Sequence, residues 1–433
     1  VTSAWPWVQS AFFVLHSIVQ LMKIHSYMDV NTTMNEEFIK LGALEEQLLQ
    51  RVTEVDAPTD APQDRAKSWN RAITRVAESL DVIYPQRIDS HLHREAFLKW
   101  ADLRVQTGAS KIRANVLLPP LQNEIPRSKS PMPEHRRLVD AISSSTSSEH
   151  LSPGLLPELD TDLRDVHPLI WHPDQQIKTL SLEISKVREA LYSAPIPGQE
   201  LGPMWPLNVS YLNFLDFQLV PSLVYKLQYP RLKEVRVWYV IERCVALFGT
   251  FLVLYVITVH WIIPATEDTS ASLLSLSLRL MAPMISCYLL LFYLMFECVC
   301  QGFAEITRFA DREFYRDWWN STSMEEFSRN WNRPVHHFLL QHVYVSLIFR
   351  AGMSKSSASV FTFLLSSVFH EIVMIIVSGK IRGYLFAMQM SQIPLIMMAR
   401  LEFIRSRPAL ANCLFWMGMV IGLPMLNILY LMF

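Results

Sequence analysis

Long uncharged apolar runs set the first expectation for this chain. The run from Cys244 to Ile263 holds twenty residues without a formal charge. At about 1.5 Å per residue, a helix of that length matches the ~30 Å hydrocarbon core of a bilayer. Further runs of similar length predict transmembrane helices over Leu280 to Cys300, Ala358 to Val377 and Ala409 to Phe433. Weaker candidates for spans cover Trp5 to Met22, Tyr211 to Gln228, Val335 to Phe349 and Tyr384 to Met398.

A polar stretch follows the first apolar segment and extends to about Met204. Within it, apolar positions three and four apart predict helices over Asn35 to Val52 and Gln175 to Leu191. Between these helices, a Pro- and Ser-rich tract from Pro119 to Ser148 cannot bury enough apolar surface to offset its ordering entropy. We expect that tract to be a disordered linker or regulatory loop.

These patterns divide the sequence into three parts. They are a transmembrane segment at 1–24, a polar loop at 25–207 with helical pieces and the disordered tract, and a multi-span core at 208–433. The chain starts at Val1 and opens on an apolar segment without the charged start of a signal peptide. We therefore expect the sequence to be truncated at its N-terminus and to lack earlier spans.

Composition agrees with this pattern and excludes one class of partner. Hydrophobic residues make up 51% of the 433-residue chain and charged residues 18%, which is too apolar for a soluble protein unless the apolar residues cluster. The formal net charge of -1 gives no global attraction to nucleic acid, and the sequence contains no recognisable basic nucleic-acid-binding motif. The cysteines lie in or beside apolar runs without paired CxxC spacing, which indicates reduced cysteines rather than a zinc site or a disulfide framework.

His370 is the leading candidate for chemistry because it lies with Glu371 in the middle of the apolar run LLSSVFHEIVMII. Ionisable groups at that depth are costly, so they usually face a cavity or a partner and mark function. Ser366 lies one helical turn before His370 and can share its face. One polar pocket would accommodate all three residues. The structural alternative is a histidine that is hydrogen-bonded to a neighbouring helix.

Several known motifs do not fit the histidines of this chain. The HExxH motif of zincins needs a second histidine where Met374 stands. His336, His337 and His342 cluster without the repeated boxes of a di-iron desaturase or metal-spaced carboxylates, so we interpret them as interfacial histidines and expect no metal site. A GxSxG nucleophile is also absent. For His370 there remains the role of general base on a hydroxyl, which suits an imidazole at neutral pH.

A second constellation joins aromatic and charged residues at the predicted membrane surface. FYRDWWN at Phe314 to Asn320 is followed by NWNRP at Asn330 to Pro334. A belt of interfacial aromatic rings explains the tryptophans. It does not explain the interleaved arginines, which are Arg308, Arg312, Arg316, Arg329 and Arg333. Guanidinium groups at this place suit either lipid phosphate or a phosphorylated cosubstrate.

At these residues the sequence resembles the membrane-bound O-acyltransferase superfamily, in the branch of sterol O-acyltransferases and type 1 diacylglycerol O-acyltransferases. The matching motifs are FYRDWWN at Phe314 to Asn320, WN at Trp331 and Asn332, SSVFHE at Ser366 to Glu371, NFLDFQLVPSLVYKLQYPR at Asn213 to Arg231, and ERC at Glu242 to Cys244. They follow the family's order and cover most of the chain from about Asn208 to its end. FYxDWWN combined with a downstream intramembrane FHE is a specific signal.

The resemblance implies an all-α fold, a polytopic transmembrane helical bundle that encloses an intramembrane reaction chamber in the endoplasmic reticulum membrane. It implies His370 as the catalytic base and Asn332 as a second catalytic residue, with possible support from Glu371. The residues expected to bind the cosubstrate acyl-CoA are Phe314, Tyr315, Asp317, Trp318, Trp319, Asn320, Trp331, Lys355 and Ser366. No further cofactor is expected, and family analogy suggests a homo-oligomer.

The resemblance leaves the acyl acceptor open between a sterol and a diacylglycerol. MKIHSY at Met22 to Tyr27, LDF at Leu215 to Phe217 and the sequence around Arg329 to Tyr344 are more similar to sterol acyltransferases, especially fungal ones. We therefore expect a steryl ester as product and keep triacylglycerol as the alternative. Two other classes stay open. One is a transporter whose His370 and Glu371 relay protons, although no inverted repeat is visible; the other is a catalytically silent lipid-binding or scaffold protein.

Overall fold

The structure is a computed structural model that describes residues 7–57, 64–83, 167–191, 205–267 and 272–432. In these residues the regular structure is helical, apart from one isolated bridge between Arg231 and Phe309. The chain divides into two compact units, one formed by Val1–Asn31 with Val209–Phe433 and one formed by Thr32–Asn208. The tract from Pro119 to Ser148, predicted to be disordered, lies outside the described residues.

Helix α1 (Trp7–Val55) contributes to both units and is uninterrupted. The sequence pattern predicted an apolar segment over Trp5 to Met22 and a separate helix over Asn35 to Val52. Both lie within α1, apart from Trp5 and Pro6, which are outside the described residues. The change from apolar to polar residues near Met22 therefore does not end the helix. In the first unit, polar side chains of α1 find buried partners that the sequence does not reveal.

The unit Thr32–Asn208 has its own apolar core. It contains the second part of α1, α2 (Arg65–Ile83), the short helix η2 (Pro168–Trp171) and α5 (Gln175–Leu191), which has the predicted bounds. Leucines of α1 at three- and four-residue spacing pack with Ile73, Ile177 and Ile184. Leu48, Ile177 and Ile184 are at most 1% exposed, so the amphipathic pattern of these helices is used to form a core.

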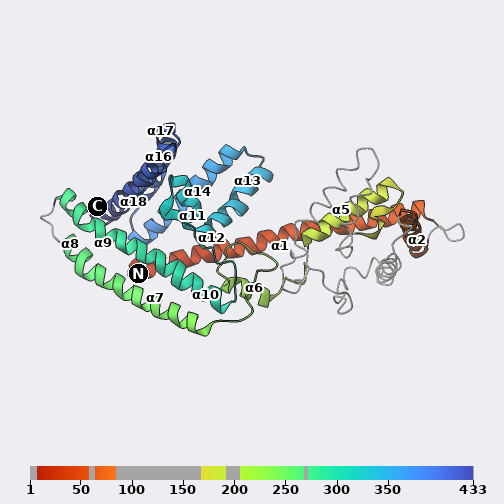
Figure 1. Ribbon diagram of the computed structural model, residues 1–433, viewed down its shortest axis with the longest axis horizontal. Helices are drawn as coiled ribbons and strands as arrows, with labels where there is room; N and C mark the ends of the chain where they lie inside the picture. The colour runs from red at the N-terminus through yellow and green to blue at the C-terminus, as the bar shows by residue number, and fades with distance from the viewer. Residues whose placement is uncertain (1–6, 58–63, 84–166, 192–204, 268–271, 433) are drawn as a thin grey trace. The chain divides into compact units, whose positions relative to one another are not determined.

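The unit Val1–Asn31 with Val209–Phe433 carries four helices long and apolar enough to cross a membrane. They are Val237–Glu267, Leu274–Ile306, Lys355–Ser378 and Pro408–Tyr430, and they confirm the four spans predicted from the apolar runs. Figure 1 shows α7 (Val237–Ile257) beside α9 (Leu273–Tyr293) and α10 (Gln301–Ile306), and α8 (Ile263–Glu267) continues beyond α7. The all-α polytopic fold is therefore confirmed.

The other elements of this unit are the remaining two of the four long helices, α14 (Lys355–Ser378) and α18 (Pro408–Met432), and several shorter elements. The shorter elements are α6 (Tyr211–Leu219), η3 (Thr258–Ile262), η4 (Leu294–Cys300), η5 (Trp318–Asn320), α11 (Met324–Trp331), α12 (Arg333–Phe338), η6 (Leu339–Val345), α13 (Ser346–Phe349), α15 (Tyr384–Met390), α16 (Gln392–Ala399) and α17 (Glu402–Arg405). Three of them, η3, η4 and η6, are π-helical turns within longer helices.

The weaker span candidates have different outcomes. The span predicted over Tyr211 to Gln228 is wrong, because α6 ends at Leu219 and Val220 is extended, the conformation favoured for a residue that precedes a proline. The segment from Val335 to Phe349 is helical through α12, η6 and α13. The segment from Tyr384 to Met398 contains α15 and α16, two short helices that meet at Ser391.

Candidate functional site

Helix α14 carries four of the residues singled out from the sequence. Ser354 caps its N-terminus by accepting a hydrogen bond from the Ser357 amide, and Gly379 ends it in the left-handed conformation at φ 68°. Between these caps the helix runs for 24 residues. Lys355 is exposed in its first turn, Ser366 lies at its middle, and His370 and Glu371 lie in its second half.

The ring of His370 is held by its own helix. Its Nδ1 lies 2.8 Å from the backbone oxygen of Ser366. A carbonyl oxygen only accepts hydrogen bonds, so Nδ1 carries the ring proton and the neutral ring presents Nε2 as an acceptor. His370 is exposed, beside apolar neighbours that are also exposed, such as Phe369 at 45%. Ser366, which was expected to share the face of His370, thus contacts its ring through the backbone oxygen, and no hydrogen bond within the described part of the chain engages Nε2.

Glu371 has a different environment from His370. Its side chain is buried and accepts hydrogen bonds from the Gly383 amide at 2.7 Å, the Phe386 amide at 2.9 Å and the Tyr430 hydroxyl. It therefore satisfies backbone donors at the start of α15 and connects α14 to α18. In the part of the chain that the structure describes, no hydrogen bond joins Glu371 to His370. The structure thus does not bring Ser366, His370 and Glu371 into one polar pocket.

Asn332 stands at the junction of α11 and α12. Its Oδ1 accepts a hydrogen bond from the Val335 amide at 3.2 Å and so caps α12. The Nδ2 donor has no hydrogen-bond partner among the described residues. The preceding Trp331 stacks on Tyr288 of α9, with the ring centroids 4.8 Å apart and the planes 8° apart. Half-buried Asn332 therefore has a fixed side chain with one free donor.

The FYRDWWN segment has a buried part that anchors it. Phe314 is 2% exposed and packs in a cluster with Phe217, Tyr225 and Phe309. Trp318 is 3% exposed and contacts the rings of Phe292, Trp331 and Trp416. These contacts show that Phe314 and Trp318 belong to the apolar core of the unit.

Tyr315 is half-buried and makes a polar contact. Its hydroxyl donates a hydrogen bond to Oε1 of Glu297 at 2.7 Å. Burial, together with this carboxylate, raises the pKa of Tyr315 to about 12, so the hydroxyl stays protonated and remains a donor.

The remaining side chains of the FYRDWWN segment are exposed on the surface of the unit. Asp317, Trp319 and Asn320 are exposed, although the backbone oxygen of Trp319 accepts hydrogen bonds from Asn412 and Trp416, both at 2.9 Å. The backbone is thus fixed to α18 while the side chains of these three residues stay accessible. Together with the exposed Arg316, they are the part of FYRDWWN that is accessible to a ligand.

Most of the arginines around this segment are neutralised within the protein. Arg312 pairs with Glu305 at 2.6 Å, and Arg316 pairs with Glu313 at 3.2 Å. Arg333 also pairs with Glu313, and Arg316 followed by Arg333 lowers the pKa of that carboxyl. These ion pairs give the arginines a structural role that the sequence did not reveal. They favour neither lipid phosphate nor a phosphorylated cosubstrate as the partner of the arginines.

Polar residues of α1 were missed by the sequence reasoning. Lys23 is 4% exposed, and its Nζ donates to the backbone oxygens of Phe217, Gln218 and Val220 at 2.6–2.9 Å, where α6 ends. Such a cation opposes the partial negative charge at a helix C-terminus. Lys23, Ser26 and Asp29 follow one another at intervals of three residues along α1. This spacing was the one indication in the sequence that these polar side chains share partners.

His342 corrects the interpretation of the histidine cluster. It is 6% exposed, with Nε2 at 2.7 Å from Oγ of Ser26 and Nδ1 at 3.0 Å from Oδ2 of Asp29. It is therefore a buried histidine rather than an interfacial one. The physical reason is that α1 supplies a hydroxyl and a carboxylate that satisfy both ring nitrogens.

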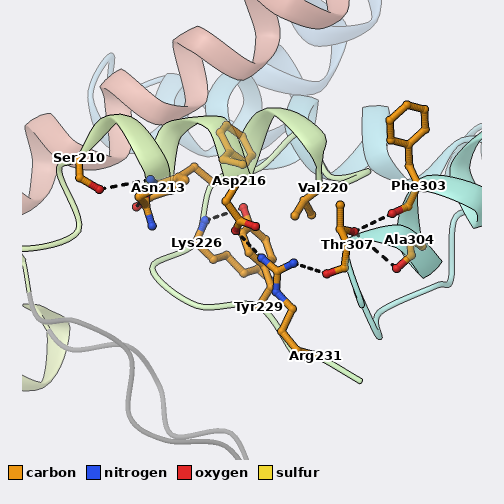
Figure 2. Close-up of polar contacts among 12 residues, drawn as sticks. Ser210, Asn213, Asp216, Val220, Lys226, Tyr229, Arg231, Phe303, Ala304 and Thr307 are labelled. Atoms are coloured by element: carbon orange, nitrogen blue, oxygen red, sulfur yellow. Dashed lines mark hydrogen bonds and ion pairs between the residues drawn. The ribbon is translucent and has the colours of Figure 1, made fainter. Parts of the chain in front are cut away.

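A second anchor holds the backbone just before FYRDWWN. Figure 2 shows the guanidinium of Arg231 between the carboxylate of Asp216 and the backbone oxygen of Thr307. Beside it, the Leu232 amide donates to the Arg308 oxygen at 2.7 Å, and the Ala310 amide donates to the Pro230 oxygen at 2.9 Å. The segment from Asn213 to Arg231, noted for its sequence resemblance, thus fixes the start of the loop that carries Phe314.

The predicted site residues fall into two groups. Lys355, Ser366 and His370 lie on α14, whereas Trp331 and residues of the FYRDWWN segment pack against α9 and α18, and Asn332 caps α12 next to Trp331. Among the described residues, no hydrogen bond or ring contact joins His370 to Asn332. The packing of α14 against η6, which continues from α12, connects the two groups within one unit.

Comparison with known proteins finds relatives among acyltransferases. The chain is 44% identical over 248 residues to the probable sterol O-acyltransferase 2 of Schizosaccharomyces pombe, covering 54% of this chain and 52% of that protein. It is 38% identical over 243 residues to the sterol O-acyltransferase 2 of Saccharomyces cerevisiae, covering 53% and 38% of the two chains. It is 36% identical over 236 residues to the diacylglycerol O-acyltransferase 1 of Dictyostelium discoideum, covering 52% and 38%. The chain thus spans about half or less of the length of these relatives.

A family model gives the wider assignment. The model of the membrane-bound O-acyltransferase family matches residues 179–432, which include α6 to α18 and every predicted site residue. The match extends over more than half of the chain and includes the four helices suited to crossing a membrane. The chain belongs to the membrane-bound O-acyltransferase family.

Proposed function

We propose that this protein transfers a long-chain fatty acyl group from acyl-CoA to the hydroxyl of a sterol, and that it does so in the endoplasmic reticulum membrane. The observation that carries the proposal is the geometry of His370. Its Nδ1 is bonded to the Ser366 oxygen, so Nε2 is the nitrogen able to accept a proton. Membership in an acyltransferase family supplies the reaction class.

His370 acts as the general base in this proposal. Nε2 removes the proton from the sterol hydroxyl as its oxygen attacks the thioester carbonyl carbon of acyl-CoA. The tetrahedral intermediate then collapses, its carbon–sulfur bond breaks, and the coenzyme A thiolate takes the proton back from the His370 imidazolium. The products are a steryl ester and free coenzyme A, and His370 returns to its neutral form.

Asn332 stabilises the oxyanion or holds the acyl-CoA. Its Oδ1 is engaged with the Val335 amide, so the side chain cannot rotate freely and its Nδ2 points in a fixed direction. A donor fixed before the reaction stabilises developing negative charge without reorganisation. This division of the amide into a structural oxygen and a free nitrogen fits the proposed role.

Acyl-CoA binding is assigned to the accessible side chains. Asp317, Trp319 and Asn320 of the FYRDWWN segment are exposed, and Lys355 is exposed at the start of α14. An ammonium group suits a phosphate of coenzyme A, and an aromatic face suits the adenine or the acyl chain. Trp331 and Ser366 contribute through positions next to Asn332 and one turn from His370.

The sterol acceptor is supported by the identity of the relatives. Two sterol O-acyltransferases match at 44% and 38% identity, and a diacylglycerol O-acyltransferase matches at 36%. The identity to the diacylglycerol O-acyltransferase is only slightly lower than the identity to the second sterol O-acyltransferase. Diacylglycerol is therefore the second candidate acceptor, with triacylglycerol as product.

The test uses membranes that contain the protein and labelled oleoyl-CoA, with a sterol and a diacylglycerol offered in parallel. We expect labelled steryl ester in excess of labelled triacylglycerol. Labelled triacylglycerol without steryl ester would overturn the acceptor assignment, and no labelled ester of either kind would overturn the proposed reaction. Membranes prepared without the protein give the background.

A further inference from the structure

A buried polar link connects α1 with η6. Oγ of Ser26 lies 2.7 Å from Nε2 of His342, and Nδ1 of the same ring lies 3.0 Å from Oδ2 of Asp29. A carboxylate only accepts hydrogen bonds, so in the neutral ring Nδ1 donates to Asp29 and Nε2 accepts from the Ser26 hydroxyl. Both nitrogens of a buried ring are therefore satisfied by one helix.

The order Ser, His and Asp is that of a hydrolase triad, but the surroundings exclude that role. Ser26 is 0% exposed and His342 is 6% exposed. The Ser26 oxygen also accepts a hydrogen bond from the Tyr225 amide at 2.8 Å. A nucleophile needs room for a carbonyl carbon next to its oxygen, whereas this oxygen is enclosed and engaged. The link is therefore structural in its immediate function.

His342 sits in a π-helical turn. The turn η6 runs from Leu339 to Val345 between α12 and α13. A π turn accommodates an additional residue, so a helix that loses it rotates one end against the other by about 100° and shifts it by about 1.5 Å. Such turns are less favourable than regular α-helix and persist where side-chain contacts hold them. The two contacts of His342 are of that kind.

The position of this turn relates it to the proposed active site. Asn332 caps α12 just before η6, and α14 with His370 starts just after α13. Asp29 also accepts a hydrogen bond at 2.7 Å from Arg350, the residue that caps the C-terminus of α13. Helix α14 packs against η6 as well. One carboxylate of α1 therefore holds both the π turn and the end of the following helix.

We propose that Ser26, Asp29 and His342 are positioning residues that fix the relative placement of Asn332 and His370. The proposal rests on the function proposed above, because it needs those two residues to act on one substrate pair. The three residues touch no substrate and act through η6. Displacements of about 1 Å between reacting groups can lower a rate by roughly 100-fold, so the loss of this link should lower turnover more than substrate binding.

The experiment compares Ser26→Ala, which removes the hydroxyl, with Ser26→Thr, which keeps it. The control is Ser17→Ala, the same change on the same helix, where the hydroxyl donates to the backbone oxygen of Phe13 one turn earlier. Asp29→Asn is the second disruptive variant. For each protein, acyl transfer from oleoyl-CoA gives kcat and KM per folded molecule, and hydrogen exchange of the peptide 339–349 reports on η6 without any need for activity.

We expect Ser26→Ala and Asp29→Asn to lower kcat by about 10- to 100-fold with KM for oleoyl-CoA changed less than about twofold, and to speed exchange in 339–349. Ser26→Thr should recover most of kcat, and Ser17→Ala should match the wild type. Unchanged exchange in Ser26→Ala would overturn the role of the link in holding η6. Faster exchange with unchanged kcat per folded molecule would overturn the positioning role. If the wild type itself transfers no acyl group, the proposed function fails, while the exchange result still decides whether the link holds η6.

Discussion

The hydroxyl of Tyr430 on α18 lies 3.1 and 3.2 Å from the two carboxylate oxygens of Glu371 on α14. The same carboxylate receives the amides of Gly383 and Phe386. Glu371 thus joins three helices, whereas the adjacent His370 bonds only to its own helix among the described residues. Glu371 therefore stabilises the packing of these helices, whereas the side chain of His370 is available for the proposed reaction.

This contact predicts different costs for two substitutions. Glu371→Ala leaves two backbone donors and a hydroxyl without their acceptor, and we expect it to lower the free energy of unfolding by about 2–5 kcal/mol. Tyr430→Phe removes one hydrogen bond and should cost about 1 kcal/mol. Thermal unfolding in detergent measures both. Equal melting temperatures for Glu371→Ala and the wild type would show that the contact does not stabilise the fold.

Asn332 allows its structural and chemical roles to be separated. Aspartate also caps helices well, so Asn332→Asp keeps the oxygen that receives the Val335 amide while it removes the Nδ2 donor. We expect normal stability and a fall in kcat of about 100- to 1,000-fold, the size seen when an oxyanion donor is removed. Asn332→Ala should lose the same activity and also about 1 kcal/mol of stability. A wild-type rate for Asn332→Asp would remove the amide from the mechanism.

Two neighbouring tryptophans should respond differently to truncation. Trp318 is 3% exposed, so Trp318→Ala opens a cavity in the aromatic core and should cost about 3–5 kcal/mol of stability. Trp319 is 39% exposed, so Trp319→Ala should leave the melting temperature nearly unchanged and raise KM for acyl-CoA. Melting curves and steady-state kinetics of both variants check this division. Similar losses of stability in both would contradict it.

The unit Thr32–Asn208 should lose stability in acid. Burial lowers the pKa of His167 from 6.5 to about 3. Because the folded-state pKa lies below the unfolded one, the neutral ring contributes stability above pH 6.5, and that stability is lost as pH falls from 6.5 towards 3. One such group costs about 1.4 kcal/mol per pH unit, or about 2 kcal/mol at pH 5. Burial also lowers the pKa of His172, in the same direction.

Protease cleavage within α5 measures this effect. The control is His167→Asn, which keeps a side-chain acceptor for the Leu169 amide but does not titrate. We expect wild-type cleavage to accelerate relative to His167→Asn between pH 7 and pH 5. A constant ratio of the two cleavage rates over this range would mean that His167 does not couple the unit to pH.

The long apolar runs were sufficient to predict the four spans, because a bilayer requires helices of about 20 apolar residues. The bounds of α5 were also predictable from its apolar spacing. The error at Tyr211 to Gln228 had no equally simple sign in the sequence, since Pro221 follows the end of α6 whereas Pro283 and Pro424 lie inside α9 and α18. Local pattern therefore determines where the long apolar helices lie, but a proline does not by itself determine where a helix ends.

The polar contacts of the first unit could not be predicted in the same way. Lys23 bonds to the Val220 oxygen and Ser26 bonds to His342. The local sequence around Lys23 and Ser26 does not indicate which residues these partners are. The same holds for His342, whose burial depends on Asp29 more than 300 residues earlier. FYRDWWN is recognisable as a motif, but its division into buried and exposed side chains depends on the aromatic residues of α9 and α18. Long-range packing sets these roles.

Steryl ester formation by His370→Ala tests the central claim most directly. Alanine keeps α14 helical and removes the base, whereas Ser17→Ala serves as a control that leaves the site unchanged. With equal amounts of folded protein in membranes, labelled oleoyl-CoA and a sterol, we predict that His370→Ala forms product at a rate reduced by about 100- to 10,000-fold, the range attributed to general base catalysis. A wild-type rate of steryl ester formation by His370→Ala would contradict the account.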